Sequence, residues 1–334
     1  MHDGPASAAG RMNELIGSAA GGSVRAIARL ISLVEAGGGS AAAVSAGLVG
    51  RPRAATLLGV TGPPGVGKST LVTALIGRYR ARAARVAVLA VDPSSPFSGG
   101  ALLGDRVRMT EHSTDPAVFI RSMSSRGELG GLSAATAGAA DVLSAVGFDI
   151  VIVETVGVGQ NEVAVLRLAD TVLLVLAPGL GDGVQAAKAG ILEIADVLVV
   201  NKADRDGVAT TVRDLKAMIA LGRSGQAAAA DWRVPVLTTV AAGAAGAGPA
   251  GLDELLESID AHRAHLDRHE GAQRRGVRRA EAAVEAVVLQ RLQESMHSPA
   301  GRELVAGAAA EVAGGSLDAH AAAARVLRAL ATDT

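Results

Sequence analysis

A short glycine-rich stretch, TGPPGVGKST at residues 61–70, is the part of the sequence best suited to chemistry. Its glycines, lysine and serine satisfy the spacing G-x-x-x-x-G-K-[ST] between an apolar run and a helical segment. Backbone N–H groups can curl around phosphate oxygens only where no Cβ intervenes, the lysine can neutralise the β- and γ-phosphates, and the serine hydroxyl can bind Mg²⁺. A glycine turn without a ligand is the alternative. The residues expected to cradle a triphosphate are Gly62, Pro63, Pro64, Gly65, Val66, Gly67, Lys68, Ser69 and Thr70.

A second motif predicts which base the nucleotide carries. Asn201, Lys202 and Asp204 form the pattern N-K-x-D at the end of the apolar run VLVV. The aspartate can accept hydrogen bonds from guanine N1–H and N2–H₂, a donor pair that adenine lacks, and such a bidentate contact is worth about 1–3 kcal/mol. Downstream of a phosphate-binding loop the pattern indicates guanine. The last base-contacting loop is expected at Val240 and Ala241, although the usual Ser-Ala pair is missing there.

Acidic residues at the ends of apolar runs are the candidates for organising Mg²⁺. Glu154 ends the run DIVIVE, and Gly157 follows at the distance at which an N–H can sense the γ-phosphate. Asp92 and Asp105 could reach the same side of the triphosphate; an Asx-turn before Pro93 and a helix N-cap are their respective alternative roles. The position after Gly157 holds a valine instead of a water-orienting glutamine, so slow intrinsic hydrolysis is expected.

Seven apolar segments between residues 55 and 240 supply the elements that must position these motifs. They alternate with stretches of helical periodicity, and their Val, Ile and Leu runs are continuous, as in a parallel sheet covered on both faces. The predicted fold class is therefore α/β, a P-loop NTPase with a mostly parallel sheet flanked by helices. The segments are ATLLGVTG, RVAVLAVD, AVFIRSM, DIVIVET, TVLLVLAP, VLVVNKAD and VPVLTTV.

Both ends of the chain are expected to be helical. Residues 1–50 form a predicted N-terminal extension with two short helices between residues 11 and 48, residues 51–260 the nucleotide-binding domain, and residues 261–334 a C-terminal helical arm. An apolar stripe on the arm is predicted to pack against another helix. The stripe consists of Val277, Ala280, Val284, Val287, Val288 and Leu292.

Composition excludes several classes of function. The 334 residues include 32 basic and 33 acidic side chains, one Trp, one Tyr, three Phe and no Cys. The chain therefore has a net charge of only −1, which gives no field to attract nucleic acid or an anionic membrane. It also has few rings to stack bases and no thiolate nucleophile or metal ligand. No apolar run is long enough to span a bilayer and the N-terminus lacks a secretory pattern, so a cytoplasmic location is expected.

Two clusters in the C-terminal part have alternative explanations. His262, His265 and His269 share one predicted helical face and could hold Ni²⁺ or Zn²⁺, but no cysteine supports a metal site and charged neighbours indicate an exposed face. The basic run QRRGVRR at residues 273–279 could touch nucleic acid. Glutamates flank it, so a solvated or partner-facing surface is favoured.

Five segments and the helical tail together resemble the MeaB/ArgK family, the GTPases that accompany adenosylcobalamin-dependent methylmalonyl-CoA mutase. The similarity runs from about residue 25 to residue 260, through GPPGVGKST, VDPSSPFSGGALLGDRVRM, RGELGGL, VETVGVGQNE and GDGVQAAKAGILEIADVLVVNKAD. The resemblance implies a Mg·GTP-dependent metallochaperone that gates cofactor delivery to the mutase, protects it from inactivation and helps exchange damaged cobalamin held by the mutase. It also implies a homodimer formed through the arm, and an adenosyltransferase is a possible second partner.

Carried over residue by residue, the resemblance marks residues 178–188 as a mobile loop in which Gln185 and Lys188 respond to the partner. Lys188 could supply transition-state charge when that loop closes, as an arginine finger does, and a solvated lysine is the alternative. Departures from the family pattern are Asn161 in place of Ser and the pair Gly183-Val184. The nucleotide and Mg²⁺ set is Lys68, Ser69, Asp92, Asp105 and Glu154, and the guanine set is Asn201, Lys202 and Asp204.

Two other functions stay open on the sequence alone. The first is a GTPase that inserts nickel into a metalloenzyme, against which the missing thiols argue. The second is a P-loop kinase that phosphorylates a small molecule, against which the N-K-x-D pattern argues. A cobalamin-mutase GTPase is the favoured interpretation.

Overall fold

The computed structural model describes residues 5–92, 110–112, 114–124, 129–155, 165–179, 192, 194–223, 232–242, 248–269 and 271–332. All seven predicted strands are present and form one sheet in the order β3-β2-β4-β1-β5-β6-β7. Every neighbouring pair is parallel, which confirms the predicted α/β class. The strands are β1 (Thr56–Thr61), β2 (Val86–Asp92), β3 (Val118–Ser124), β4 (Ile150–Thr155), β5 (Thr171–Leu176), β6 (Val197–Val200) and β7 (Val236–Thr238).

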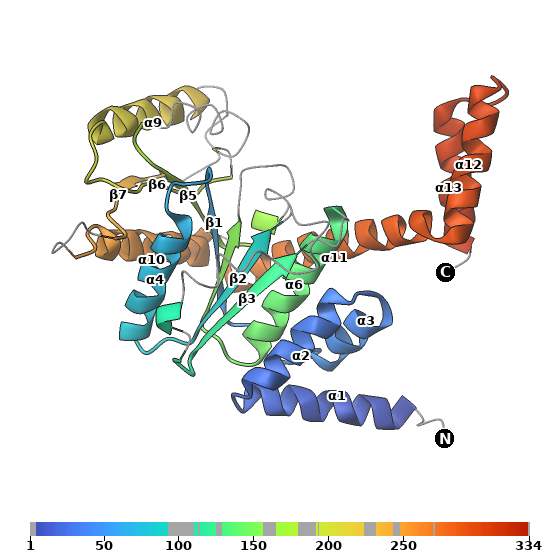
Figure 1. The fold of residues 1–334 in the computed structure, drawn as a ribbon, viewed down its shortest axis with the longest axis horizontal. Coiled ribbons are helices and arrows are strands. Elements are labelled where there is room, and N and C mark those ends of the chain that lie inside the picture. The colour runs from blue at the N-terminus through green and yellow to red at the C-terminus, as the bar shows by residue number, and fades with distance from the viewer. Residues whose placement is uncertain are drawn as a thin grey trace.

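Helices cover both faces of the sheet, as Figure 1 shows. On one face, α4 (Lys68–Ala81) and α10 (Leu252–His269) pack against side chains such as Leu58. On the other face, α2 (Val24–Glu35) and α6 (Leu129–Ala145) pack against side chains such as Leu57. Successive strand residues point to opposite faces, so each strand must be apolar throughout. The helix α9 (Val208–Arg223) covers β5 and β6.

The N-terminal extension has three helices, so the prediction of two was wrong. They are α1 (Pro5–Ala20), α2 and α3 (Gly38–Gly47). Gly37 and Gly38 have φ of 71° and 52°, a left-handed backbone that turns the chain and lets the alanine-rich run begin a new helix. At the end of α3, a Cβ on Gly47 would lie 2.7 Å from Ile16 Cδ1 of α1, so the glycine permits a close helix contact.

The C-terminal part forms a helical arm. In Figure 1, α11 (Gly271–His297) runs away from the sheet, and α12 (Pro299–Ala313) and α13 (Ala319–Thr332) stand together at its far end. The predicted domain boundary at residue 260 falls inside α10. Of the helices that the structure describes, none is long and apolar enough to cross a bilayer.

The valines of the apolar stripe predicted on this arm are exposed within the chain, so the packing of the stripe against another helix stays a prediction. Val284 and Val288 are 63% and 50% exposed, and Val277 is 53% exposed. Smaller residues take their place: Ala283 packs on the buried cluster beneath α6, and Ala286 is buried. The surface of α6 is itself rich in alanine, and two alanine faces can approach more closely than an alanine and a valine face.

Candidate nucleotide-binding site

The predicted phosphate loop connects β1 to α4 at the carboxyl edge of the sheet, and two of its glycines are required by close contacts. A Cβ on Gly62, where φ is 149°, would lie 2.0 Å from Val175 O of the neighbouring strand. A Cβ on Gly67, where φ is 90°, would lie 2.6 Å from Asn201 Nδ2. Gly65 also has a left-handed φ of 80°. The loop therefore has the compact backbone that the glycine spacing predicted.

Lys68 is buried at the first turn of α4 and points into the loop. Its Nζ donates to Gly62 O at 2.7 Å and to Pro63 O at 3.0 Å. Phosphate oxygens are stronger, charged acceptors for an ammonium group than neutral carbonyls. The lysine is therefore held next to the loop amides, where it can exchange these carbonyls for the phosphates of a nucleotide.

Ser69 and Glu154 lie together beside the lysine. Ser69 Oγ donates to Glu154 Oε1 at 2.7 Å, and both residues are buried. The pair forms because Glu154 stands opposite Val60 in the adjacent strands β4 and β1, at the end from which the phosphate loop leaves. A hydroxyl and a carboxylate are the hard oxygen ligands that Mg²⁺ prefers, so these residues fit a magnesium ion bound by Ser69 and reached by Glu154 through water.

The structure does not show the other predicted Mg²⁺ and partner-responsive residues in contact with Ser69 and Glu154. Asp92 is the last residue of β2, the strand next to β4, so its backbone lies at the same edge of the sheet. The remaining ones lie outside the described residues. They are Asp105, Gly157, Gln185 and Lys188.

Asn201 links the base-recognition motif to the phosphate loop. Its side chain, 2% exposed, donates from Nδ2 to Val66 O at 2.9 Å and to Gly67 O at 3.4 Å. Its Oδ1 accepts from Thr239 Oγ1 and from Ala241 N, both at 3.2 Å. The sequence did not single out Thr239 as a contact. Only its place in the last base-contacting loop could have indicated the role.

Lys202 also lies against the phosphate loop. Its backbone has φ of 57°, and its Nζ donates to Gly65 O at 2.6 Å. Asp204 follows in an exposed turn, and its contact with a guanine base stays a prediction. Val240 pairs with Ala250 in an isolated antiparallel bridge, which closes the last predicted base-contacting loop at its start. Asn201 and Lys202 of the predicted guanine set therefore border the phosphate loop at the carboxyl edge.

Comparison with known proteins identifies the family to which this chain belongs. The model of the family described as "Methylmalonyl Co-A mutase-associated GTPase MeaB" matches residues 27–300. The chain belongs to the MeaB family of GTPases. The family resemblance seen in the sequence is confirmed, and as a MeaB-family protein the chain hydrolyses GTP.

Individual relatives agree with this assignment. A protein of Pyrococcus abyssi named as a GTPase is 47% identical over 277 residues, 83% of this chain and 84% of that protein. The mitochondrial methylmalonic aciduria type A homolog of Mus musculus is 46% identical over 149 residues, 45% of this chain and 36% of that protein. A crystal structure of LAO/AO transport system kinase superposes with a TM-score of 0.66 at 25% identity, and the match covers 98% of this chain and 99% of that one.

The three histidines of α10 lie at the opposite, amino edge of the sheet. His262 is 3% exposed, so the prediction of an exposed face was wrong for this residue. Its Nδ1 lies 2.9 Å from Thr171 Oγ1, its Nε2 lies 3.4 Å from Asp196 Oδ1, and its ring centroid is 4.7 Å from that of Trp232. Burial, with smaller effects from His265 and then Arg278, lowers the pKa of His262 to about 4, and Asp170 opposes this shift.

Proposed function

We propose that this MeaB-family GTPase is a Mg²⁺-dependent metallochaperone for an adenosylcobalamin-dependent acyl-CoA mutase of the methylmalonyl-CoA mutase type. The observation that carries the proposal is the match to the mutase-associated GTPase family over residues 27–300. The similarity to a relative named for methylmalonic aciduria supports the same partner. In this role the GTPase gates cofactor delivery and protects or reactivates the mutase in the cytoplasm, while the mutase holds the cobalamin. An adenosyltransferase is a possible second partner.

The residues at the carboxyl edge of the sheet would have separate roles in binding the nucleotide. The loop amides and Lys68 bind the phosphates, Ser69 and Glu154 hold Mg²⁺, and Asp204 selects guanine. Bound Mg²⁺ would neutralise charge on the phosphate oxygens. Basal turnover is slow because Val158 cannot orient a water molecule. Gln185 and Lys188 would respond to the mutase, and Lys188 would add charge to the transition state only in the complex.

We also propose that the arm forms a homodimer. Most of the large apolar side chains exposed in the described part of the chain gather on α11, α12 and α13. Such clustering on one part of the chain is typical of a protein interface, whereas scattered single apolar residues are normal on any surface. Exchange of Val284 and Val288 for glutamate should give a monomer in sedimentation analysis. The clustered side chains are Val277, Val284, Val287, Val288, Leu289, Met296, Leu304, Val305 and Leu327.

The test of the chaperone proposal is GTP turnover with and without purified methylmalonyl-CoA mutase, in apo and cobalamin-loaded forms. We expect the mutase to accelerate hydrolysis, with Lys68→Ala as the control that removes nucleotide chemistry. Acceleration by a nickel-dependent apoenzyme alone, or phosphate transfer to a small acceptor instead of water, would contradict the proposal. The same assay therefore also tests the two alternatives.

A further inference from the structure

Arg279 of the arm helix α11 forms an ion pair with a buried aspartate at the amino edge of the sheet, opposite the nucleotide site. Its Nε donates to Asp170 Oδ1 at 2.8 Å, and its Nη2 pairs with Asp170 Oδ2. Its Nη1 donates to Ala55 O at 3.3 Å. The Asp170 side chain is 4% exposed. Two parallel bonds between a guanidinium and a carboxylate fix orientation as well as distance, so this pair sets where α11 lies.

The same aspartate holds the start of the strand that carries the phosphate loop. Asp170 Oδ2 accepts from Leu57 N at 2.8 Å, and Asp170 N donates to Leu57 O at 2.8 Å. Leu57 is the second residue of β1, and Asp170 immediately precedes β5. Arg279 is thus joined through one carboxylate to two adjacent strands at the point where both begin.

These two strands lead directly to the nucleotide site. They run parallel and paired from the Arg279 contact to the phosphate loop, where Gly62 lies so close to Val175 O that no Cβ fits. A displacement of β1 against β5 at the amino edge therefore changes the distance between Gly62 and Val175 at the carboxyl edge. Paired strands are stiff along their length, so the contact at one end bears on the geometry at the other.

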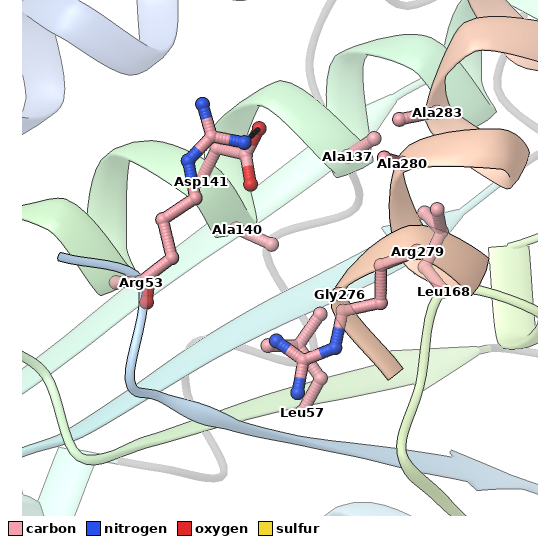
Figure 2. Close-up of a pocket in the computed structure, with 11 residues that line it drawn as sticks. Arg53, Leu57, Ala137, Ala140, Asp141, Leu168, Gly276, Arg279, Ala280 and Ala283 are labelled. Atoms are coloured by element: carbon pink, nitrogen blue, oxygen red, sulfur yellow. Dashed lines mark ion pairs between the residues drawn. The ribbon is translucent and has the colours of Figure 1, made fainter. Parts of the chain in front are cut away.

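The ion pair of Arg279 is a directional contact between α11 and the sheet, set among small side chains. Figure 2 shows Ala280 and Ala283 of α11 facing Ala137 of α6, with the Arg279 guanidinium reaching toward Leu57. A cavity of about 90 Å³ lies between these elements. The alanine packing between α11 and α6 brings the helices close together, and the bidentate ion pair adds a contact of fixed geometry to the sheet.

The outer part of the arm reaches the body of the protein through α11. In Figure 1, α12 and α13 stand clear of the sheet, and their buried side chains pack on each other. The exposed valines of α11 begin at Val277, two residues before Arg279 and on another side of the helix, and continue at Val284 and Val288. A protein bound to this surface would therefore contact α11, the helix whose Arg279 binds Asp170.

We propose that Arg279 is a positioning residue for the phosphate loop, so that a change at its contact with Asp170 alters affinity for nucleotide. The inference rests on the nucleotide site assigned above and adds a remote residue to it. Energetic coupling between two sites is reciprocal, so bound nucleotide should in turn stabilise the contact of α11 with Asp170.

The test compares Arg279→Met and Arg279→Lys with the matched control Arg275→Met. Arg275 lies one turn earlier on α11 and pairs with the exposed Asp267 of α10, away from the strands. We expect calorimetry to show GDP binding weakened about tenfold in Arg279→Met, partly restored in Arg279→Lys, and within about twofold of wild type in Arg275→Met. Urea unfolding without nucleotide gives the folded fraction of each variant.

If Arg279→Met does not fold, amide hydrogen exchange of the wild type still tests the role of Arg279. Saturating GDP should slow amide hydrogen exchange in peptides covering residues 274–284 of α11, and leave residues 9–20 of α1 unchanged. Equal exchange of the α11 peptides with and without GDP, or equal GDP affinity in all variants, would overturn this inference alone. Failure of the wild type to bind guanine nucleotide would overturn the assigned site and this inference with it.

Discussion

The buried histidine of α10 makes the stability of the protein depend on pH in a direction that the structure fixes. His262 has a pKa of about 4, against 6.5 for an exposed imidazole. Between these values it is neutral in the folded chain and protonated in the unfolded chain. The unfolded state then binds more protons, so the free energy of unfolding falls as pH drops below 6.5. The groups around the ring are Thr171, Asp196, Trp232, His265, Arg278 and Asp170.

The size of this effect follows from the two pKa values. At about 1.4 kcal/mol per pKa unit, the full loss well below pH 4 is about 3 kcal/mol, and about 2 kcal/mol is already lost at pH 5. At pH 7 both states are mainly neutral, so the group contributes almost nothing. Typical domains are stable by about 5–15 kcal/mol, so this single imidazole accounts for a measurable share of acid sensitivity.

The assay is urea unfolding at pH 7 and pH 5 for the wild type, His262→Gln and His269→Gln. The glutamine at position 262 cannot be protonated, so the loss of stability between the two pH values should be smaller by about 2 kcal/mol than in the wild type. His269 is exposed at the end of α10, and its variant should follow the wild type. Equal pH dependence in the wild type and His262→Gln would refute the reasoning, whatever the absolute stabilities.

Four further predictions concern the nucleotide site. Lys68→Ala should abolish GTP turnover in a phosphate-release assay, because no other ammonium group reaches Gly62 O and Pro63 O in the described part of the site; unchanged turnover would contradict the phosphate assignment. Asp204→Asn should lower the preference for GTP over XTP by about tenfold or more, from about 1–3 kcal/mol of base contact, and competition binding measures it. Gly62→Ala should reduce GDP affinity strongly in calorimetry, because its Cβ would lie 2.0 Å from a carbonyl oxygen. Lys188→Ala should blunt mutase-stimulated hydrolysis more than basal hydrolysis, and equal losses in the two rates would count against a mobile finger.

The parts of the fold that the sequence predicted well depend on local patterns. A buried parallel strand must be apolar on both faces, so each of the seven strands is visible as a continuous run. The phosphate loop is likewise local, because its glycines, lysine and serine lie within eight consecutive residues, 62–69. Spacing alone therefore indicated both the element and the chemistry.

Other features depend on contacts between distant segments, and no local pattern contains them. Asn201 accepts from Thr239 and donates to Val66, which lies 135 positions earlier. The burial of His262 depends on Thr171 of β5 and on Trp232, whereas its neighbours in sequence are charged. The glycines before α3 end one helix and begin another, and only packing against α1 distinguishes this from a simple loop.

The contacts of the two lysines indicate how nucleotide affinity is set. Lys68 Nζ binds two carbonyls of the phosphate loop, and Lys202 Nζ binds the carbonyl of Gly65. A nucleotide that takes up the Lys68 ammonium group exchanges neutral acceptors for charged phosphate oxygens, so its affinity reflects the difference between two hydrogen-bonded states. Any change that strengthens the lysine–carbonyl contacts weakens nucleotide binding. The position of β1 controls where those carbonyls lie, and Asp170 and Arg279 hold its first residues, so a distant contact can alter affinity without touching the nucleotide.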